Sequence, residues 1–99
     1  MPPRSLRFHP EAIDEAAAAA DWYAAKAGEG IAANLELELK RAFDLIAEAP
    51  LRCPEHSRGT RRYLLRRFPF SIIYRVLPSS IQVIAVAHAR RRPGYWRKR

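Results

Sequence analysis

The fold is decided by residues 61–76, RRYLLRRFPFSIIYRV, and by residues 80–88, SIQVIAVAH, which follow after a short turn. Isoleucine, valine, tyrosine and phenylalanine dominate both stretches, as they do in β-strands. Two proline-containing turns divide the region into three predicted strands, over 61–67, 70–77 and 80–88. Connections as short as these require neighbouring strands to run antiparallel.

Two amphipathic helices are predicted before these strands. A short strand at Leu6–Phe8 comes first, and Pro10 suits the first turn of a helix, where no backbone N–H is needed. The first helix carries apolar residues at helical spacing, at Ile13, Ala16, Ala17, Ala20, Tyr23, Ala24 and Ala27. Gly28–Gly30 ends it. The second helix, Ile31 to Glu48, has a stripe at Ile31, Leu35, Leu39, Ala42 and Ile46.

These elements predict an α+β fold in a single domain, residues 1–99. A short N-terminal strand and an antiparallel αα-hairpin pack on a small, mainly antiparallel sheet of three or four strands. The last two strands are apolar on both faces, notably at Ile72, Ile73 and 83–87. We therefore expect the helices to cover one face and another segment to cover part of the other. A basic, aromatic tail, residues 89–99, follows the sheet.

Charge is divided unevenly along the chain. All ten acidic residues lie at or before Glu55, together with six basic residues, so that part has a net charge of −4. From His56 onward there are twelve basic residues and no acidic one, which brings the whole chain to +8. Because a solvated surface normally mixes both signs, this asymmetry predicts an anionic partner for the second half.

The composition bounds the compartment and the chemistry. Cys53 is the only cysteine, so no intrachain disulfide forms, and we interpret it as an ordinary thiol. The segment Met1–Phe8 lacks the apolar core of a signal peptide, and the longest apolar run, Ala16–Ala20, is too short to span a bilayer. We therefore expect a cytoplasmic protein that binds no membrane. No residue spacing suggests a metal site or a phosphate loop, so no metal, cofactor or small-molecule ligand is expected.

The arginines of the predicted sheet leave two interpretations open. Alternate residues of a strand share a face, so Arg62 and Arg66 point the same way. If the strands bring Arg66, Arg75 and Arg90 onto one face, they form a phosphate-sized cationic patch, because a guanidinium fork binds phosphate through two hydrogen bonds. In the other interpretation the arginines are separate, solvated surface charges.

Three residues near the end of the chain also have alternative roles. His88 directly precedes an arginine run, which would favour its neutral form and let it accept a proton near neutral pH. The favoured alternative is a strand-end histidine satisfied by the backbone. Tyr95 and Trp96 could stack on nucleic-acid bases. Because exposed aromatics in a free tail are uncommon, we favour their folding back as an apolar lid on the sheet.

Two motifs within this order of elements resemble a known family. Phe68-Pro69-Phe70 followed by Tyr74 is similar to a Phe-Pro-aromatic…Tyr strand, and 86–91 is similar to a Val-x-His-x-Arg-Arg strand end. In these features the chain resembles the RelE/ParE superfamily of toxins from type II toxin–antitoxin modules, closest to the ParE-like, plasmid-stabilisation branch. The resemblance covers nearly the whole chain. It implies a growth-inhibiting toxin that a cognate antitoxin holds inactive.

The superfamily that this chain resembles has two activities. ParE-like members poison DNA gyrase, whereas RelE-like members cleave mRNA in the ribosome without a metal. For the nuclease, the resemblance implies catalytic roles for Arg66, which matches the transition-state arginine, and for Arg90, which matches the second arginine. The C-terminal tyrosine of the nucleases matches Tyr95 or, one residue on, Trp96. His88 is the remaining catalytic candidate.

The chain departs from the nucleases at their two lysines, which would align with Ser57 and Gly59. Arginines nearby keep the charge but cannot accept a proton, so efficient RNA cleavage lacks its base. We therefore predict a toxin that binds and poisons gyrase; a ribosome-dependent mRNA endonuclease and a non-toxic, basic nucleic-acid-binding module are the alternatives. The residues predicted to contact the target are Arg61, Arg62, Arg67, Arg75, Arg91, Arg92 and Trp96.

The antitoxin is expected to cover apolar side chains of the helix hairpin, namely Trp22, Leu37 and Phe43, and to face the basic sheet with acidic residues. Trp22 lies opposite Ile13 around the first helix, so burying both within one domain is difficult. The alternative is that Trp22 simply packs against the second helix.

Overall fold

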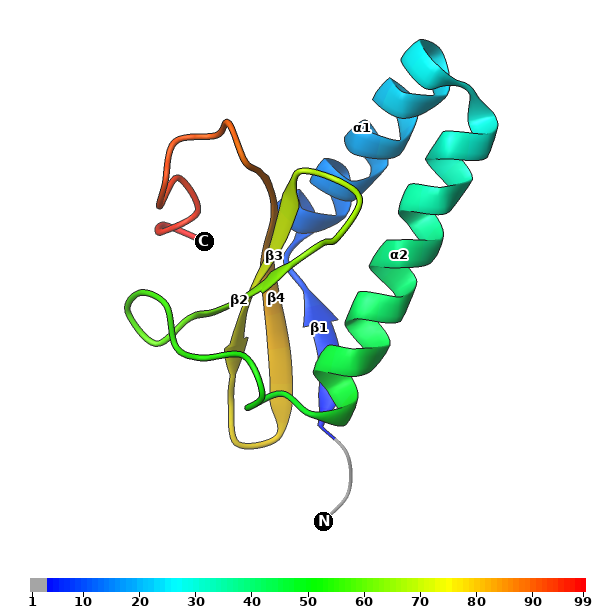
Figure 1. The fold of residues 1–99 in the computed structure, drawn as a ribbon. Helices are drawn as coiled ribbons and strands as arrows, with labels where there is room; N and C mark the ends of the chain where they lie inside the picture. The colour runs from blue at the N-terminus through cyan, green and yellow to red at the C-terminus, as the bar shows by residue number, and fades with distance from the viewer. Residues whose placement is uncertain (1–3) are drawn as a thin grey trace.

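The computed structural model describes residues 4–99 and shows two helices packed on one face of a four-stranded sheet (Figure 1). The elements in chain order are β1 (Ser5–Phe8), α1 (Pro10–Ala27), α2 (Glu29–Glu48), β2 (Arg61–Leu64), β3 (Phe70–Val76) and β4 (Ser80–His88). The C-terminal tail lies on the opposite side of the sheet from the helices. The predicted α+β fold is confirmed.

The sheet has the strand order β1-β4-β3-β2. β1 runs parallel to β4, and the β4–β3 and β3–β2 pairs are antiparallel, as their short connections require. The register shifts between Ile73 and Tyr74, because Ile73 faces Ala85 whereas Tyr74 faces Val83. Ile84 is therefore the extra residue of a β-bulge, and it turns toward the same side as Ala85.

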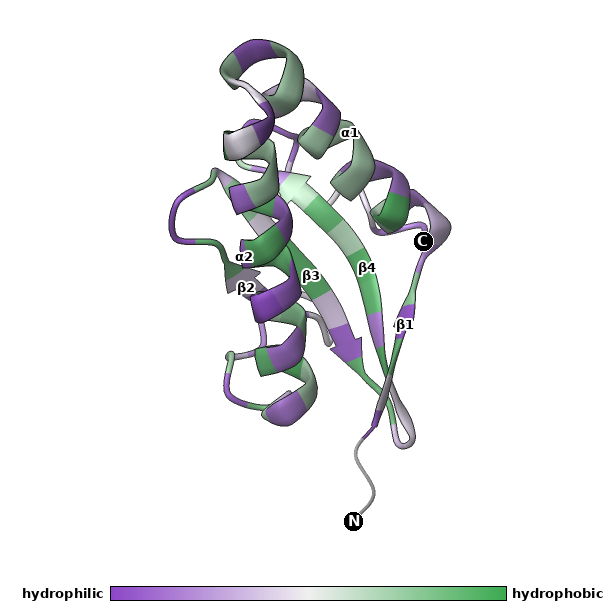
Figure 2. Cartoon of the chain, turned by 90° about the vertical axis from the view of Figure 1, so that its right-hand side faces the viewer, coloured by the Kyte–Doolittle hydropathy of each residue, from purple (hydrophilic) through white to green (hydrophobic). Residues whose placement is uncertain are grey.

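The main core lies between the helices and the sheet. α2 buries Leu35, Leu39, Ala42 and Ile46 of its predicted stripe, together with Ala32, while Ile31 is exposed. β3 and β4 supply Ile72, Tyr74, Ile81, Val83 and Val86 to this core. In Figure 2 apolar residues run along most of β3 and β4, while hydrophilic residues recur along both helices.

The predicted core face of α1 is correct in part: Ala16 and Tyr23 pack against the core, but Ile13 and Ala17 are exposed. Ala12 and Ala19 are the buried residues, whereas Ile13 is 55% exposed. The helix packs closely against α2 and β4, and small alanine side chains allow that approach where isoleucine would not. An alanine-rich helix has only a weak apolar periodicity, so its buried side cannot be identified from spacing alone.

A second, smaller core lies on the other face of the sheet. Ile73, Ile84, Ala85 and Ala87 are covered there by Trp96 of the tail. The expectation that another segment covers this face is confirmed. Among the described helices, neither is both long and apolar enough to cross a bilayer.

β2 is shorter than predicted, because it ends at Leu64 and not at Arg67. The backbone N–H of Arg66 donates a hydrogen bond of 2.6 Å to the Glu38 carboxylate of α2, and the N–H of Arg67 donates one of 3.4 Å to the same oxygen. These amides are bonded to a helix side chain and not to a neighbouring strand. Leu65, just after the strand, is buried.

A single residue, Gly28, separates α1 from α2, with φ at 97° and ψ at 162°. This conformation is restricted essentially to glycine. We expect Gly28→Ala to lower the free energy of unfolding by about 1–3 kcal/mol, measured by urea titration.

Gly30→Ala is the matched control, since Gly30 lies within α2 and an added Cβ would meet nothing within 4 Å. Alanine has the higher helix propensity, so this variant should be as stable as the wild type or more so. Equal destabilisation by both substitutions would contradict the role assigned to Gly28.

Candidate functional site

A small hollow of about 100 Å³ lies between the tail and the face of the sheet opposite the helices. Ile73 and Ala87 contribute from the sheet, and Tyr95 and Trp96 contribute from the tail. Two arginines and two histidines line it, namely Arg62, Arg91, His56 and His88, and no carboxylate does. We call this feature the cationic hollow.

Three separate segments bring the basic groups of the cationic hollow together. Arg62 faces Ile73 across the β2–β3 pair, so it shares the side of the sheet that the tail covers. His88 ends β4, and Arg91 lies over the ring of Tyr95 at 3.9 Å from its centroid, in a cation–π contact. Arg62 and Arg91 have no carboxylate within ion-pair distance in residues 4–99. Their charge is therefore available to an anionic ligand.

Arg61, by contrast, is used inside the protein. Its guanidinium donates to the carbonyl of Cys53 and lies 3.8 Å from the Glu55 carboxylate, and its side chain is largely shielded. The loop 49–60 passes over this side of β2, which is why Arg61 is not free while its neighbour Arg62 is. The prediction that Arg61 contacts a target is therefore not supported by its position.

Trp96 is also placed differently from the predicted contact residue. Only 9% of it is exposed, because its ring packs on the second core. The structure shows the arrangement that we favoured, in which Trp96 folds back as an apolar lid on the sheet. Tyr95 lies beside it with ring centroids 5.4 Å apart, and its hydroxyl donates a hydrogen bond of 2.6 Å to Glu15. Burial is the main cause and this bond to Glu15 the second cause of a raised pKa of Tyr95. Its hydroxyl is therefore a poor proton acceptor at neutral pH.

Glu15 of α1 holds the tail in this position. Its carboxylate accepts hydrogen bonds from the backbone N–H of Val86 at 3.0 Å, from Tyr95, and from both terminal nitrogens of Arg99 at 2.8 and 3.0 Å. Burial by itself would raise the pKa of Glu15. The hydrogen bonds from Arg99, Tyr95 and Val86 and the charge of Arg99 outweigh burial, so the pKa of Glu15 lies below its usual value.

The arginines predicted to form one patch lie apart. Arg66 and Arg67 line a groove beside α2, whereas Arg90 lines a different groove beside α1. Arg75 lies in β3 opposite Gln82, on the side of the sheet away from the helices. The prediction that Arg66, Arg75 and Arg90 form a single patch is therefore wrong.

His88 is the one predicted catalytic residue that borders two of these features, the cationic hollow and the groove beside α1. Its Nδ1 accepts a hydrogen bond of 3.0 Å from the backbone N–H of Arg90, and its ring meets Phe70 edge-on. This is the backbone-satisfied histidine that we favoured. Arg92 is exposed beyond it. Within residues 4–99, no three His, Cys, Asp or Glu side chains are placed to hold a metal ion.

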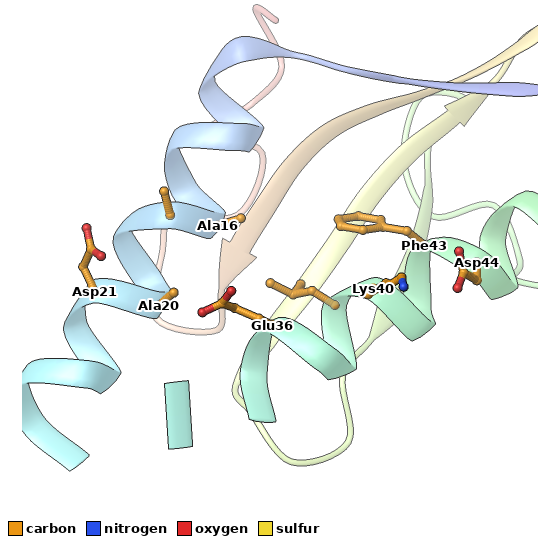
Figure 3. Close-up of a pocket in the computed structure, with 9 residues that line it drawn as sticks. Ala16, Ala20, Asp21, Glu36, Lys40, Phe43 and Asp44 are labelled. Carbon is orange, nitrogen blue, oxygen red and sulfur yellow. The ribbon is translucent and has the colours of Figure 1, made fainter. Parts of the chain in front are cut away.

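Trp22, Leu37 and Phe43 line three different grooves around the helix hairpin. Trp22 is 56% exposed and lines the groove beside α1 that Arg90 also borders, with a volume of about 570 Å³. Leu37 lines the groove beside α2 that Arg66 also borders, with a volume of about 400 Å³. Phe43 lines a groove of about 480 Å³ between α1 and α2 and packs edge-on against Phe8. Figure 3 shows Phe43 and Glu36 pointing across this groove toward α1. The packing alternative for Trp22 is not what the structure shows.

A family model described as the ParE toxin of the type II toxin–antitoxin system parDE matches residues 6–93. The chain belongs to the ParE toxin family. A solved structure described as the chromosomal ParDE TA system from P. aeruginosa has a similar fold, with a TM-score of 0.78 and 22% sequence identity. The similarity covers 88% of this chain and 97% of that chain. No curated protein matches the sequence significantly.

The residues that hold this surface in place, Glu15, Arg99 and Glu38, have no distinctive signal in the sequence. Glu15 reads as a helix-dipole residue in the sequence, Arg99 as one of many terminal cations, and Glu38 as an exposed helix acid. Their partners are distant in the chain; Arg99 and Glu15 are separated by 84 residues. No local spacing signals such pairs.

We expect the protein to lose stability in acid through Glu15. Because the folded state lowers the pKa of Glu15, the unfolded chain takes up a proton first, and the free energy of unfolding falls as the pH drops below the ordinary value of 4.5. Glu15→Gln should cost about 2 kcal/mol at neutral pH, and its difference from the wild type should shrink as the pH falls through the lowered pKa. Urea titrations from about pH 7 to about pH 3 measure both effects.

Asp14→Asn serves as the control, since this neighbouring carboxylate is exposed and makes no ion pair in the described chain. Its difference from the wild type should stay small at every pH. A Glu15→Gln difference that is independent of pH would contradict the ionised carboxylate in the folded state.

Proposed function

We propose that this chain is the toxin of a type II toxin–antitoxin module that acts by binding DNA gyrase, and that a cognate antitoxin neutralises it. The family match supports the toxin and the antitoxin partner, and the resemblance to the ParE-like branch supports gyrase. The observation that carries the binding mechanism is the cationic hollow, where Arg62 and Arg91 have no carboxylate partner. Unpaired guanidinium groups in a shared concavity suit an anionic surface on the target.

The nuclease alternative has less support. Its four candidate residues do not share one site, because Arg66 borders the groove beside α2 while His88 and Tyr95 border the cationic hollow. The Tyr95 hydroxyl already donates to Glu15 and has a raised pKa, and arginine cannot act as the base. A binding poison needs no proton acceptor, so these features agree with it.

The proposed antitoxin contact follows from the grooves. Trp22, Leu37 and Phe43 lie in three grooves on different sides of the hairpin, so a partner that covers all three has to extend around the helices. Arginines border two of the three, Arg90 beside Trp22 and Arg66 beside Leu37, whereas the groove beside Phe43 is lined by Lys40 and three carboxylates, Asp21, Glu36 and Asp44. An extended segment that alternates apolar and acidic residues fits this surface.

Gyrase inhibition tests the target. Purified toxin should inhibit gyrase-catalysed supercoiling, and the double variant Arg62→Ala, Arg91→Ala should need at least about 10-fold more protein for half inhibition, because it removes both free guanidinium groups of the cationic hollow. The control Lys26→Ala, Arg41→Ala removes the same two charges from the helices and should leave inhibition within about 2-fold. Unaffected supercoiling at saturating wild-type protein would overturn the gyrase proposal, and codon-positioned mRNA cuts in a translation extract, abolished by Arg66→Ala, would replace it with the nuclease.

Antitoxin binding is tested with the small protein encoded beside the toxin gene. Trp22→Ala should weaken the complex by at least about 10-fold in Kd, since exposed tryptophans dominate interface energies. Ile13→Ala is a matched control, because Ile13 has nearly the same exposure, 55% against 56%, on the same helix. Equal loss of affinity in both variants, measured by titration calorimetry, would remove Trp22 from the interface.

A further inference from the structure

The C-terminal tail is held on the sheet by side chains and not by its backbone. Within the described chain, Ala89 donates to the Pro69 carbonyl, and beyond it the backbone hydrogen bonds of the tail join tail residues to one another or to His88. The polar anchors are Tyr95 and Arg99, and both reach Glu15. Arg99 also lies 3.2 Å from the Glu11 carboxylate and donates a hydrogen bond of 3.1 Å to the carbonyl of Ile84. Trp96 adds the apolar contact with the second core.

One hydrogen bond of the Glu15 carboxylate comes from the sheet and not from the tail. The pairing of β1 with β4 ends at Phe8 and Val83, where the chain leaves the sheet to begin α1. Past this point the edge of β4 has lost its strand partner, and the N–H of Val86 donates to Glu15. A carboxylate that accepts this bond from the sheet is oriented in part independently of the tail, and it is an acceptor for Tyr95 and Arg99.

A chain of contacts connects Glu15 to the cationic hollow. Glu15 accepts from the hydroxyl of Tyr95, and the ring of Tyr95 carries Arg91 at 3.9 Å and Arg99 at 5.1 Å from its centroid. Arg91 is one of the two unpaired arginines of the cationic hollow. Its position at the hollow therefore depends on where Tyr95 is held.

We propose that Glu15 is a positioning residue, whose carboxylate holds the tail closed on the sheet through Tyr95 and Arg99 and thereby places Arg91 at the cationic hollow. Loss of the carboxylate opens the tail, uncovers Trp96 and separates Arg91 from Arg62. The effect on target inhibition rests on the proposed function, whereas the opening of the tail does not. The grooves around the helix hairpin are formed without the tail residues 91–99, so antitoxin binding should persist when the tail opens.

Trp96 reports on the tail directly. In a Trp22→Phe background it is the only tryptophan, and its burial should give weak quenching of its fluorescence by acrylamide. Glu15→Gln in this background should raise the quenching constant at least about 3-fold, while Asp14→Asn on the same helix should leave it unchanged. The increase in the double variant Glu15→Gln, Arg99→Ala should be less than the sum of the two single increases, because the two residues share one ion pair, although Arg99 also contacts Glu11 and the carbonyl of Ile84.

The functional arm uses the same Glu15→Gln protein with its native Trp22. Gyrase inhibition should weaken at least about 10-fold, and the Kd for the protein encoded beside the toxin gene should stay within about 2-fold of the wild type. If Glu15→Gln fails to fold, Arg99→Ala carries both arms, because it leaves the bond from Val86 to Glu15 intact.

The outcomes separate the two proposals. If Trp96 stays shielded in the folded Glu15 and Arg99 variants, Glu15 does not hold the tail closed, whatever the result with gyrase. If Trp96 becomes exposed but gyrase inhibition is unchanged, Glu15 does not position Arg91 for the target. If Trp96 becomes exposed in the variants and the wild type does not inhibit gyrase, Glu15 holds the tail closed and the proposed function is overturned.

Discussion

The structure depends on one partly buried carboxylate that joins three parts of the chain. Glu15 connects α1 to the free edge of β4 and to the tail, through hydrogen bonds to Val86, Tyr95 and Arg99. A shielded ionised group is costly unless donors surround it, so the three parts support one another. If the tail leaves, the carboxylate loses its charged partner and the second core loses its cover. The position of the tail at the cationic hollow and the cover of the second core therefore both depend on the contacts of Glu15.

Much of the fold could be predicted because its strongest signals are local. The apolar run of β4 between two turns gave its bounds, and the stripe of α2 gave all of its buried residues except Ala32. The α1 face was predicted only in part, because alanines occupy half of the helix and spacing cannot distinguish the side with Ala12 from the side with Ile13. The end of β2 was missed because Glu38, far away in sequence, binds the amides of Arg66 and Arg67. Where a distant side chain decides a boundary, periodicity carries no information about it.

The candidate site shows the same division. Composition indicated an arginine-rich second half that meets an anionic partner, but not which arginines are free. Arg61 and Arg62 are adjacent and chemically identical, yet one is paired with Glu55 and the other lines the cationic hollow. The parity of a strand separates their faces, and only the path of the loop 49–60 and of the tail determines which face has a carboxylate. The predicted patch failed for this reason, since strand register and loop path were unknown.

The short β2 strand has a consequence for the free toxin. It is one of the two edge strands of the sheet and spans only Arg61–Leu64, with Leu64 exposed. An open edge invites another copy to add its own strand, and shortness and like charge both oppose that. Arg61 is paired with Glu55, but two molecules that meet at this edge bring their unpaired Arg62 side chains together, and this like-charge contact disfavours edge-to-edge pairing. The same basic residues therefore help to keep the protein dispersed during the interval in which no antitoxin covers it.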